Sequence, residues 1–136
     1  MNNVTLARSY LEKARVRLKV LSLLMQEEAY SDVVREAQEA VELALKGMLR
    51  HIGVEPPKQH DVGYLLAEYS HKLPDEVADS VNELISISKW LRKEREFSFY
   101  GDVDFIPTLE YTRKDGERAY KDLETVLKAA EKTITD

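Results

Sequence analysis

The sequence predicts a single-domain, all-α protein in which about five helices form an up-and-down antiparallel bundle. With 136 residues the chain can bury about two-thirds of its unfolded surface, so a core needs no disulfide. Three long segments repeat their apolar residues at the spacing of one helix face. Only five glycines and four prolines interrupt the chain. We therefore expect residues 1–136 to form one helical domain.

Each of the three long segments carries six residues on one seam, at intervals of four and three residues. Such seams favour nearly antiparallel packing of helices. The same spacing is compatible with a coiled-coil dimer, which we favour less because turns interrupt the segments and small residues share the seams. The seams consist of Ala7, Leu11, Ala14, Leu18, Leu21 and Met25; of Tyr30, Val34, Ala37, Val41, Ala44 and Met48; and of Gly116, Tyr120, Leu123, Leu127, Ala130 and Ile134.

Glycine and proline predict the end of the second helix and the beginning of the fourth. The second helix should stop near Ile52, because Gly53 can adopt a left-handed conformation and two prolines follow it. A short third helix is expected over residues 60–71, beginning at His60. Pro74 suits the first turn of a fourth helix, which we expect to run to about Arg95.

The fifth helix is expected to begin near Arg113. Thr112 and Asp115 have the spacing of a capping box, in which each side chain bonds to the backbone of the other residue. Residues 96–111 are then the one long connection between helices.

Charge and composition limit the classes of function. The net charge of −5 argues against indiscriminate binding to nucleic acid, although residues 1–20 carry five basic side chains and one acidic side chain. There is no cysteine, and the three histidines are far apart in the sequence, so we expect neither a metal site nor a cofactor. No apolar run reaches the ~20 residues of a membrane span, and no secretory signal is present. We expect a cytoplasmic protein without membrane contact.

Arg95 occupies a position where the seam of the fourth helix calls for an apolar residue. Burial of an unpaired cation is costly, so this arginine must extend to solvent, pair with a carboxylate or line a cleft that binds an anion. Position alone leaves these alternatives open. The preceding seam residues are Val77, Val81, Leu84, Ser88 and Leu91.

The connection over residues 96–111 contains all three phenylalanines of the chain, at positions 97, 99 and 105. Their rings could close the end of the bundle, or they could stack on bases or dock a partner protein. Long connections in compact domains are often functional, which slightly favours recognition. Four basic residues precede the connection, and they could either bind phosphate or form a solvated face: Lys89, Arg92, Lys93 and Arg95.

The residues alone do not favour an enzyme of a common type. Carboxylates are plentiful, but none has the spacing of a metal cluster. The chain also lacks a glycine-rich phosphate loop and a nucleophile elbow.

Two stretches of the chain together resemble the HEPN domain family. Residues 35–66, with REAQEAVELALKGMLRHIG, PPKQHDV and a Leu-Leu pair, are similar to its second and third helices. Residues 91–102, LRKEREFSFYGD, are similar to its motif region at the end of the fourth helix. The resemblance implies a dimeric bundle of about five helices. It also implies either an RNA-cleaving toxin or an accessory protein paired with a minimal nucleotidyltransferase.

The family's ribonuclease motif is an arginine, four to six further residues and a histidine, with two copies meeting across the dimer. Here Arg95 matches the arginine, but Tyr100 stands where the histidine is expected, and no histidine follows His71. A tyrosine of ordinary pKa, about 10, is a poor general base at neutral pH. The resemblance therefore implies retained binding more strongly than retained cleavage.

The sequence thus predicts a homodimeric protein that binds nucleotide or RNA and works with a minimal nucleotidyltransferase in a toxin–antitoxin-like pair. The candidate binding residues are Arg92, Arg95, Tyr100 and Asp102. Arg95 and Tyr100 are also the candidate catalytic residues if cleavage survives. The alternatives are an active metal-independent ribonuclease and a purely structural interaction module.

Overall fold

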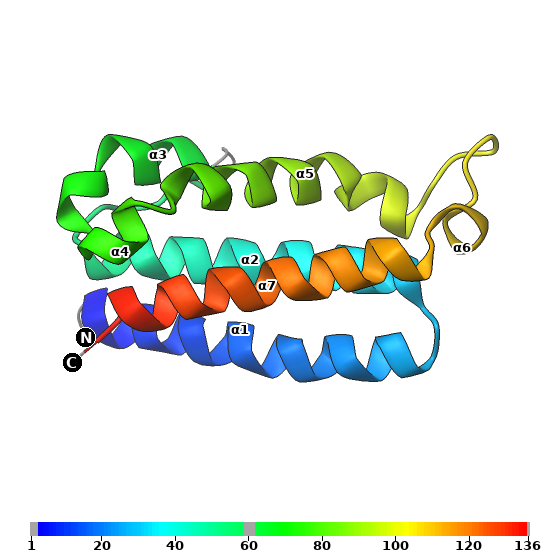
Figure 1. Cartoon of the computed structure of the whole chain (residues 1–136), viewed down its shortest axis with the longest axis horizontal. Helices are drawn as coiled ribbons and strands as arrows, with labels where there is room; N and C mark the ends of the chain where they lie inside the picture. Colours follow the sequence, from blue (N-terminus) through cyan, green and yellow to red (C-terminus); the bar gives the residue numbers. More distant parts are fainter. Residues whose placement is uncertain (1–2, 59–61, 136) are drawn as a thin grey trace.

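A computed structural model describes residues 3–58 and 62–135 of the chain. Four long helices run alternately up and down, which confirms the predicted all-α antiparallel bundle (Figure 1). They are α1 (Asn3–Gln26), α2 (Tyr30–His51), α5 (Val81–Phe99) and α7 (Arg113–Thr133). Shorter pieces complete the described part of the chain: α3 (Gly63–Glu68), the 3₁₀ turn η1 (Ser70–Lys72), α4 (Asp75–Ala78) and α6 (Pro107–Glu110).

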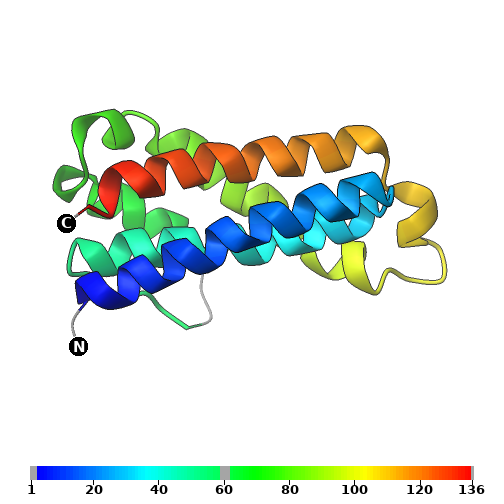
Figure 2. The ribbon, with the colours of Figure 1, turned by 90° about the horizontal axis from the view of Figure 1, so that it is seen from below.

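The helix α2 lies at the centre of the bundle. It packs against α1, α5 and α7, whereas α5 and α7 make few contacts with each other. Figure 2 shows α2 behind α1, with α7 alongside. Alanines on α2 allow close approach of its neighbours, and larger apolar residues fill the space between the helices. The fully buried members are Val33, Val34, Ala37, Ala40, Ala44, Leu45, Met48 and Leu49.

The predicted cap residues form the predicted helix ends. Ile52 is the C-cap of α2, and Gly53 follows with a φ of 86°, in the left-handed region that favours glycine. At the start of α7, the Thr112 backbone N–H donates to Asp115 Oδ2 at 2.8 Å, as part of a complete capping box. Both helix boundaries are therefore confirmed.

The third and fourth helices differ from their predicted extents. The start of the third helix at His60 lies outside the described residues; α3 spans Gly63–Glu68 and is followed by η1 rather than by more α-helix. The fourth helix is interrupted at Asp79 and Ser80, which separate α4 from α5. Ser80 Oγ donates to Glu76 O at 2.9 Å. Serine hydroxyls compete in this way with the backbone bonds of a helix.

The helix α5 continues for four residues beyond Arg95, so the prediction that residues 96–111 form a connection was wrong at its start. The backbone N–H of Tyr100 still donates to Glu96 O at 2.9 Å. Gly101, with a φ of 68°, then ends the helix. A Cβ at this position would collide with Phe105 O, so close approach of the chain also requires glycine here.

The remaining connection is folded back on itself. Asp102 and Phe105 exchange backbone hydrogen bonds of 2.9 Å, and α6 follows. Phe105 packs edge-to-face against Phe97 and Tyr111, with ring centroids 5.5 and 5.6 Å apart. The aromatic residues therefore do close the end of the bundle in part, while Phe97 and Phe99 stay about half exposed.

No helix formed by residues 3–58 and 62–135 is long and apolar enough to cross a membrane.

Replacement of Leu45 by alanine should lower the free energy of unfolding by about 2–5 kcal/mol, because Leu45 is fully buried on the central helix and a cavity would remain. Leu109→Ala is the matched control, since this leucine is 77% exposed and should contribute little. Urea unfolding of both variants measures the difference. Equal stability of the two variants would contradict the central position of α2.

Candidate functional site

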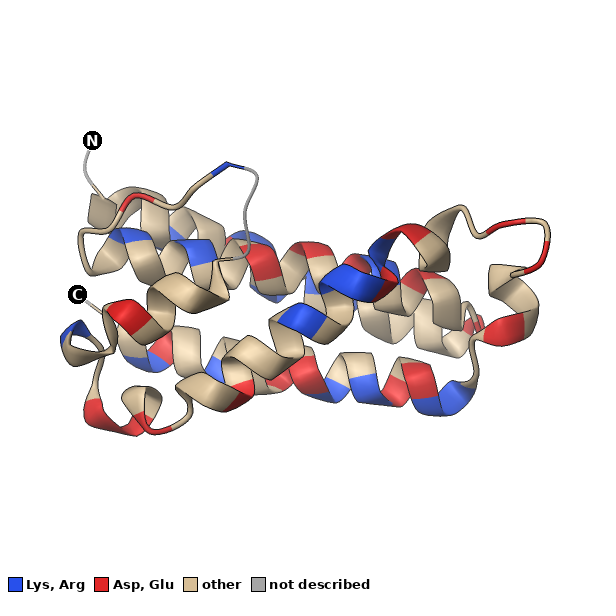
Figure 3. Cartoon of the chain, turned by 90° about the horizontal axis from the view of Figure 1, so that it is seen from above, with Lys and Arg blue, Asp and Glu red and all other residues tan. Residues whose placement is uncertain are grey.

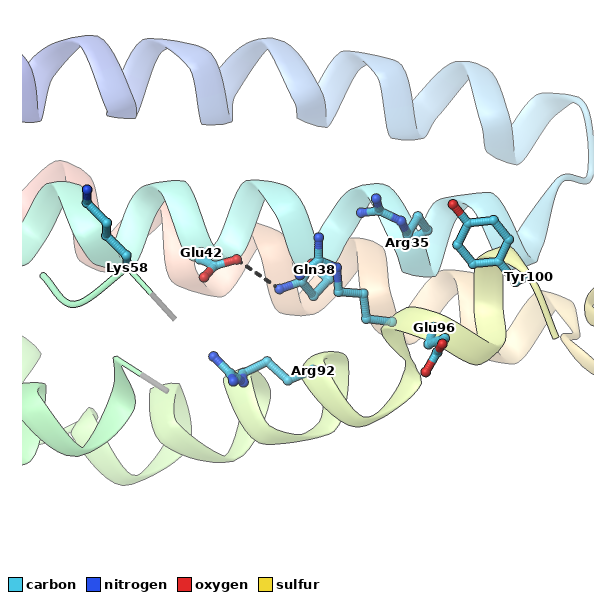
Figure 4. Close-up of a pocket in the computed structure, with 8 residues that line it drawn as sticks. Arg35, Gln38, Glu42, Lys58, Arg92, Glu96 and Tyr100 are labelled. Carbon is cyan, nitrogen blue, oxygen red and sulfur yellow. Dashed lines mark hydrogen bonds between the residues drawn. The ribbon is translucent and has the colours of Figure 1, made fainter. Parts of the chain in front are cut away.

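A cleft of about 640 Å³ lies between α2 and α5 (Figure 4). Side chains from both helices and from the two connections that follow them form its walls. They are Arg35, Gln38, Glu42, Lys58, Arg92, Arg95, Glu96 and Tyr100.

Helical spacing explains why these residues meet. On α2, Arg35, Gln38 and Glu42 are separated by three and four residues and so share one stripe. On α5, Glu96 and Tyr100 lie four and eight residues after Arg92, with Arg95 beside them. The last of these residues, Tyr100, is the C-cap of the helix and is 77% exposed. The cleft is thus the space between two polar stripes on helices that pack together.

The lining of the cleft contains more cationic than acidic side chains, although the chain is acidic. Four cationic side chains line it against two carboxylates, those of Glu42 and Glu96. Figure 4 shows Glu96 pointing away from α2, so this carboxylate offsets the positive field less than Glu42 does. Figure 3 shows basic residues grouped along the second half of α5. Such a concentration of positive charge in a concave site attracts anions.

Glu39 forms ion pairs with Arg35 on α2 and Arg95 on α5. Its Oε1 lies 2.7 Å from Arg35 Nη1 and 3.5 Å from Arg95 Nη2. The hydrogen bond from Arg35 is the largest cause that holds the pKa of this carboxyl below its usual value, and the charge of Arg95 adds to it. Arg35 also lies over the ring of Phe99, 5.3 Å from its centroid. The two guanidinium groups are therefore positioned before any ligand arrives.

Gln38 is a buried polar residue in the wall of the cleft. Its side chain is 3% exposed, and Nε2 donates to Glu42 Oε2 at 3.1 Å (Figure 4). Its Oε1 has no hydrogen-bond partner among the described residues. Glu42 in turn lies 3.4 Å from Lys46 Nζ through its other oxygen. A buried acceptor without a partner is uncommon in folded proteins and calls for an explanation.

Three of the four residues predicted to bind nucleotide line the cleft: Arg92, Arg95 and Tyr100. Asp102 is not among the residues that line it; its Oδ1 accepts the backbone N–H of Val103 in the turn after α5. Of the alternatives for Arg95, the structure shows pairing with Glu39 together with a place in the cleft. A binding role for these residues remains a prediction.

The contribution of α2 to this cleft was not predicted from the sequence. Arg35, Gln38 and Glu42 lie beside the apolar seam of the second helix, and their spacing could have marked a second stripe. Lys58 had no such signal, because it lies in a connection.

The lining offers donor groups that suit a phosphate-bearing ligand. Guanidinium and ammonium groups are the donors that bind phosphate oxygens. The eight described residues that line the cleft include no histidine. The described part of the chain also contains no group of three His, Asp or Glu side chains arranged to hold a metal ion.

Comparison with known proteins places this helical bundle in a family. The profile of the HEPN domain matches residues 7–133, nearly the whole chain. The chain belongs to the HEPN domain family. This HEPN chain is also similar to a protein of Methanocaldococcus jannaschii named "Putative toxin MJ1304", with 28% identity over 132 residues that cover 92% of this chain and 86% of the relative. No solved structure matches it significantly.

Glu39→Gln should make the HEPN chain less stable at neutral pH by about 0.5–1 kcal/mol, because the ion pairs are partly exposed. The folded-state pKa of Glu39 is lowered, so its stabilisation is present above the usual value of 4.5 and is lost as the pH falls through the lowered pKa. The difference between wild type and variant in urea unfolding should shrink on acidification. A pH-independent difference would contradict the ion-pair assignment.

Proposed function

We propose that this HEPN protein binds RNA or a nucleotide through phosphate in the cleft between α2 and α5. The observation that carries the proposal is the convergence of four cationic side chains and the Tyr100 phenol on one cleft of about 640 Å³. A volume of this size is in the range of pockets for nucleotide-sized ligands. The family membership and the similarity to a protein named as a toxin support a role connected with RNA.

The arginines are suited to hold one phosphate between the two helices. A guanidinium group can donate two parallel hydrogen bonds to phosphate oxygens, and Arg35 and Arg95 already share one carboxylate, Glu39. A phosphate oxygen can contact both arginines, as Oε1 of Glu39 does. Tyr100, at the end of α5, can donate its hydroxyl hydrogen to the same group.

The proposed role is binding rather than cleavage. Phosphodiester cleavage by general acid–base catalysis needs a group that exchanges protons near neutral pH. An imidazole supplies this property, and a phenol of ordinary acidity does not. Arg95 and Tyr100 therefore act as ligands of the phosphate in this proposal.

The proposal includes a homodimer and a minimal nucleotidyltransferase as partner, in a toxin–antitoxin-like pair in the cytoplasm. Large apolar side chains remain exposed close to the site, in and after the end of α5, which supports a protein contact at this end of the bundle. They are Phe97, Phe99, Val103, Ile106 and Leu109.

Arg35→Ala should weaken binding of a short single-stranded RNA about tenfold, because it removes a charge-assisted contact to phosphate. The slope of log affinity against log salt should fall by about 0.7. Fluorescence anisotropy over a range of salt concentrations measures both quantities, and Arg95→Ala should behave in the same way.

Two controls separate the site from overall charge. Lys93 is an exposed residue next to Arg92 that does not line the cleft, and Arg113 is an exposed arginine at the start of α7. Lys93→Ala and Arg113→Ala should each change affinity less than twofold. Equal losses in all four variants would show a diffuse electrostatic attraction and no cleft site.

The double variant Val103→Ser, Leu109→Ser should lose co-purification with a minimal nucleotidyltransferase from the same organism, since 87% and 77% of these side chains are exposed and apolar. Val16→Ser is the control, because it replaces an exposed valine on α1, which does not contribute to this end surface. If the double variant still retains the transferase, the partner contact does not involve Val103 and Leu109.

A further inference from the structure

Glu42 stands apart from the other residues of the cleft, because its carboxylate repels a phosphate. It is held in place by two contacts, from Gln38 Nε2 at 3.1 Å and Lys46 Nζ at 3.4 Å. Each contact uses a different oxygen, so both oxygens retain a free lone pair. The carboxylate is therefore a fixed pair of acceptors in a cleft that otherwise offers donors.

Gln38 positions the carboxylate of Glu42 in this part of the cleft. The residue is 97% buried, lines the cleft and leaves Oε1 without a partner among the described residues. Its neighbours Ala37 and Val41 are apolar and buried, so an apolar residue would suit the packing. The amide keeps Glu42 in position at the cost of an unsatisfied acceptor.

The acceptor and donor groups occupy different parts of the cleft. Figure 4 shows Arg35 and Tyr100 close to one end, and Glu42 and Arg92 farther along between α2 and α5. Arg92 lines the cleft together with Gln38 and Glu42, and the same three residues line a crevice too narrow to hold a water molecule, so a base beside Glu42 would lie in the cleft itself. The apolar walls of this crevice are Val41, Val62 and Leu91.

We propose that Glu42 and Arg92 read the base of the bound nucleotide and select guanine. This inference rests on the proposed function, because it assigns the base that accompanies the phosphate. Glu42 accepts the N1–H and the 2-amino hydrogen of guanine through its two oxygens. Arg92 donates to O6, and Gln38 is a positioning residue that orients the carboxylate.

The complementarity distinguishes guanine from the other bases. Its Watson–Crick edge presents two adjacent donors followed by an acceptor, which matches a carboxylate followed by a guanidinium. Adenine and cytosine each place a ring nitrogen acceptor next to their amino group, and this acceptor would face the carboxylate. Uracil offers one donor between two acceptors. An unpaired or repelled polar group in a largely desolvated site costs affinity.

The test compares guanosine, inosine and adenosine 5′-monophosphates, with ribose 5-phosphate as the probe without a base. Wild type should bind the guanosine nucleotide at least tenfold more tightly than the adenosine nucleotide, since two charge-assisted hydrogen bonds are at stake. The inosine nucleotide lacks the 2-amino group and should fall between them. Isothermal titration at constant salt gives the four affinities.

Glu42→Gln should abolish the preference for guanine or turn it toward adenine, because an amide offers one donor and one acceptor. Gln38→Met should reduce the guanine-to-adenine affinity ratio by a larger factor than it reduces the affinity for ribose 5-phosphate, whereas a general loss of structure would weaken all probes alike. Glu36→Gln is the control, on the same helix but outside the lining of the cleft.

The outcomes separate this inference from the proposed function. Equal affinities for the guanosine and adenosine nucleotides, unchanged in Glu42→Gln, would overturn base selection while leaving phosphate binding intact. Failure of every probe to bind, ribose 5-phosphate included, would overturn the proposed function and base selection together. Circular dichroism of each variant shows whether it is folded. If Glu42→Gln does not fold, the guanine-to-adenine affinity ratio of Gln38→Met tests base selection in its place.

Discussion

The packing of α2 against α1, α5 and α7 holds the candidate site together. Three neighbours cover this helix, and its buried alanines and leucines leave it little freedom to rotate or slide. Rotation of α2 would move apolar residues into the cleft and polar residues into the core, a change that is strongly unfavourable. The positions of Arg35, Gln38 and Glu42 therefore follow from burial of the opposite faces of the same helix.

Electrostatic interactions within the cleft orient its charged groups in advance. Glu39 approaches arginines from both helices, and Gln38 and Lys46 hold Glu42 from different sides. Fixed donors and acceptors bind a ligand with less loss of conformational freedom than side chains that must first be ordered. The exposed ion pairs contribute little to stability on their own. Their effect is on geometry, since they keep like-charged arginines close together in the absence of an anion.

The sequence was sufficient to predict the bundle because periodic seams and cap residues are local signals. Thr112 and Asp115 form a cap with their own backbone, and Gly53 ends α2 through its own φ angle. The interruption at Ser80 and the continuation of α5 to Phe99 were not predicted. Both depend on competition between weak local preferences, which tertiary packing decides.

The candidate site was predictable only on the side of α5. The arginines were conspicuous because Arg95 falls on an apolar seam, whereas the polar residues of α2 lie beside a regular seam and have the pattern of an ordinary solvated face. Which two faces meet depends on how the helices are arranged in space, and periodicity does not contain this information. The buried state of Gln38 is likewise a property of the pair of helices and not of the sequence of either one.

The end of α5 places Tyr100 at the cleft. Because the helix continues past Arg95, Tyr100 lies eight residues after Arg92 on nearly the same stripe, and its phenol reaches the cleft in place of pointing into a loose connection. Gly101 then turns the chain away, and a Cβ there would collide with Phe105 O. The turn thus leaves the Tyr100 hydroxyl group at one end of the cleft. A donor in this position can form a hydrogen bond with a phosphate oxygen.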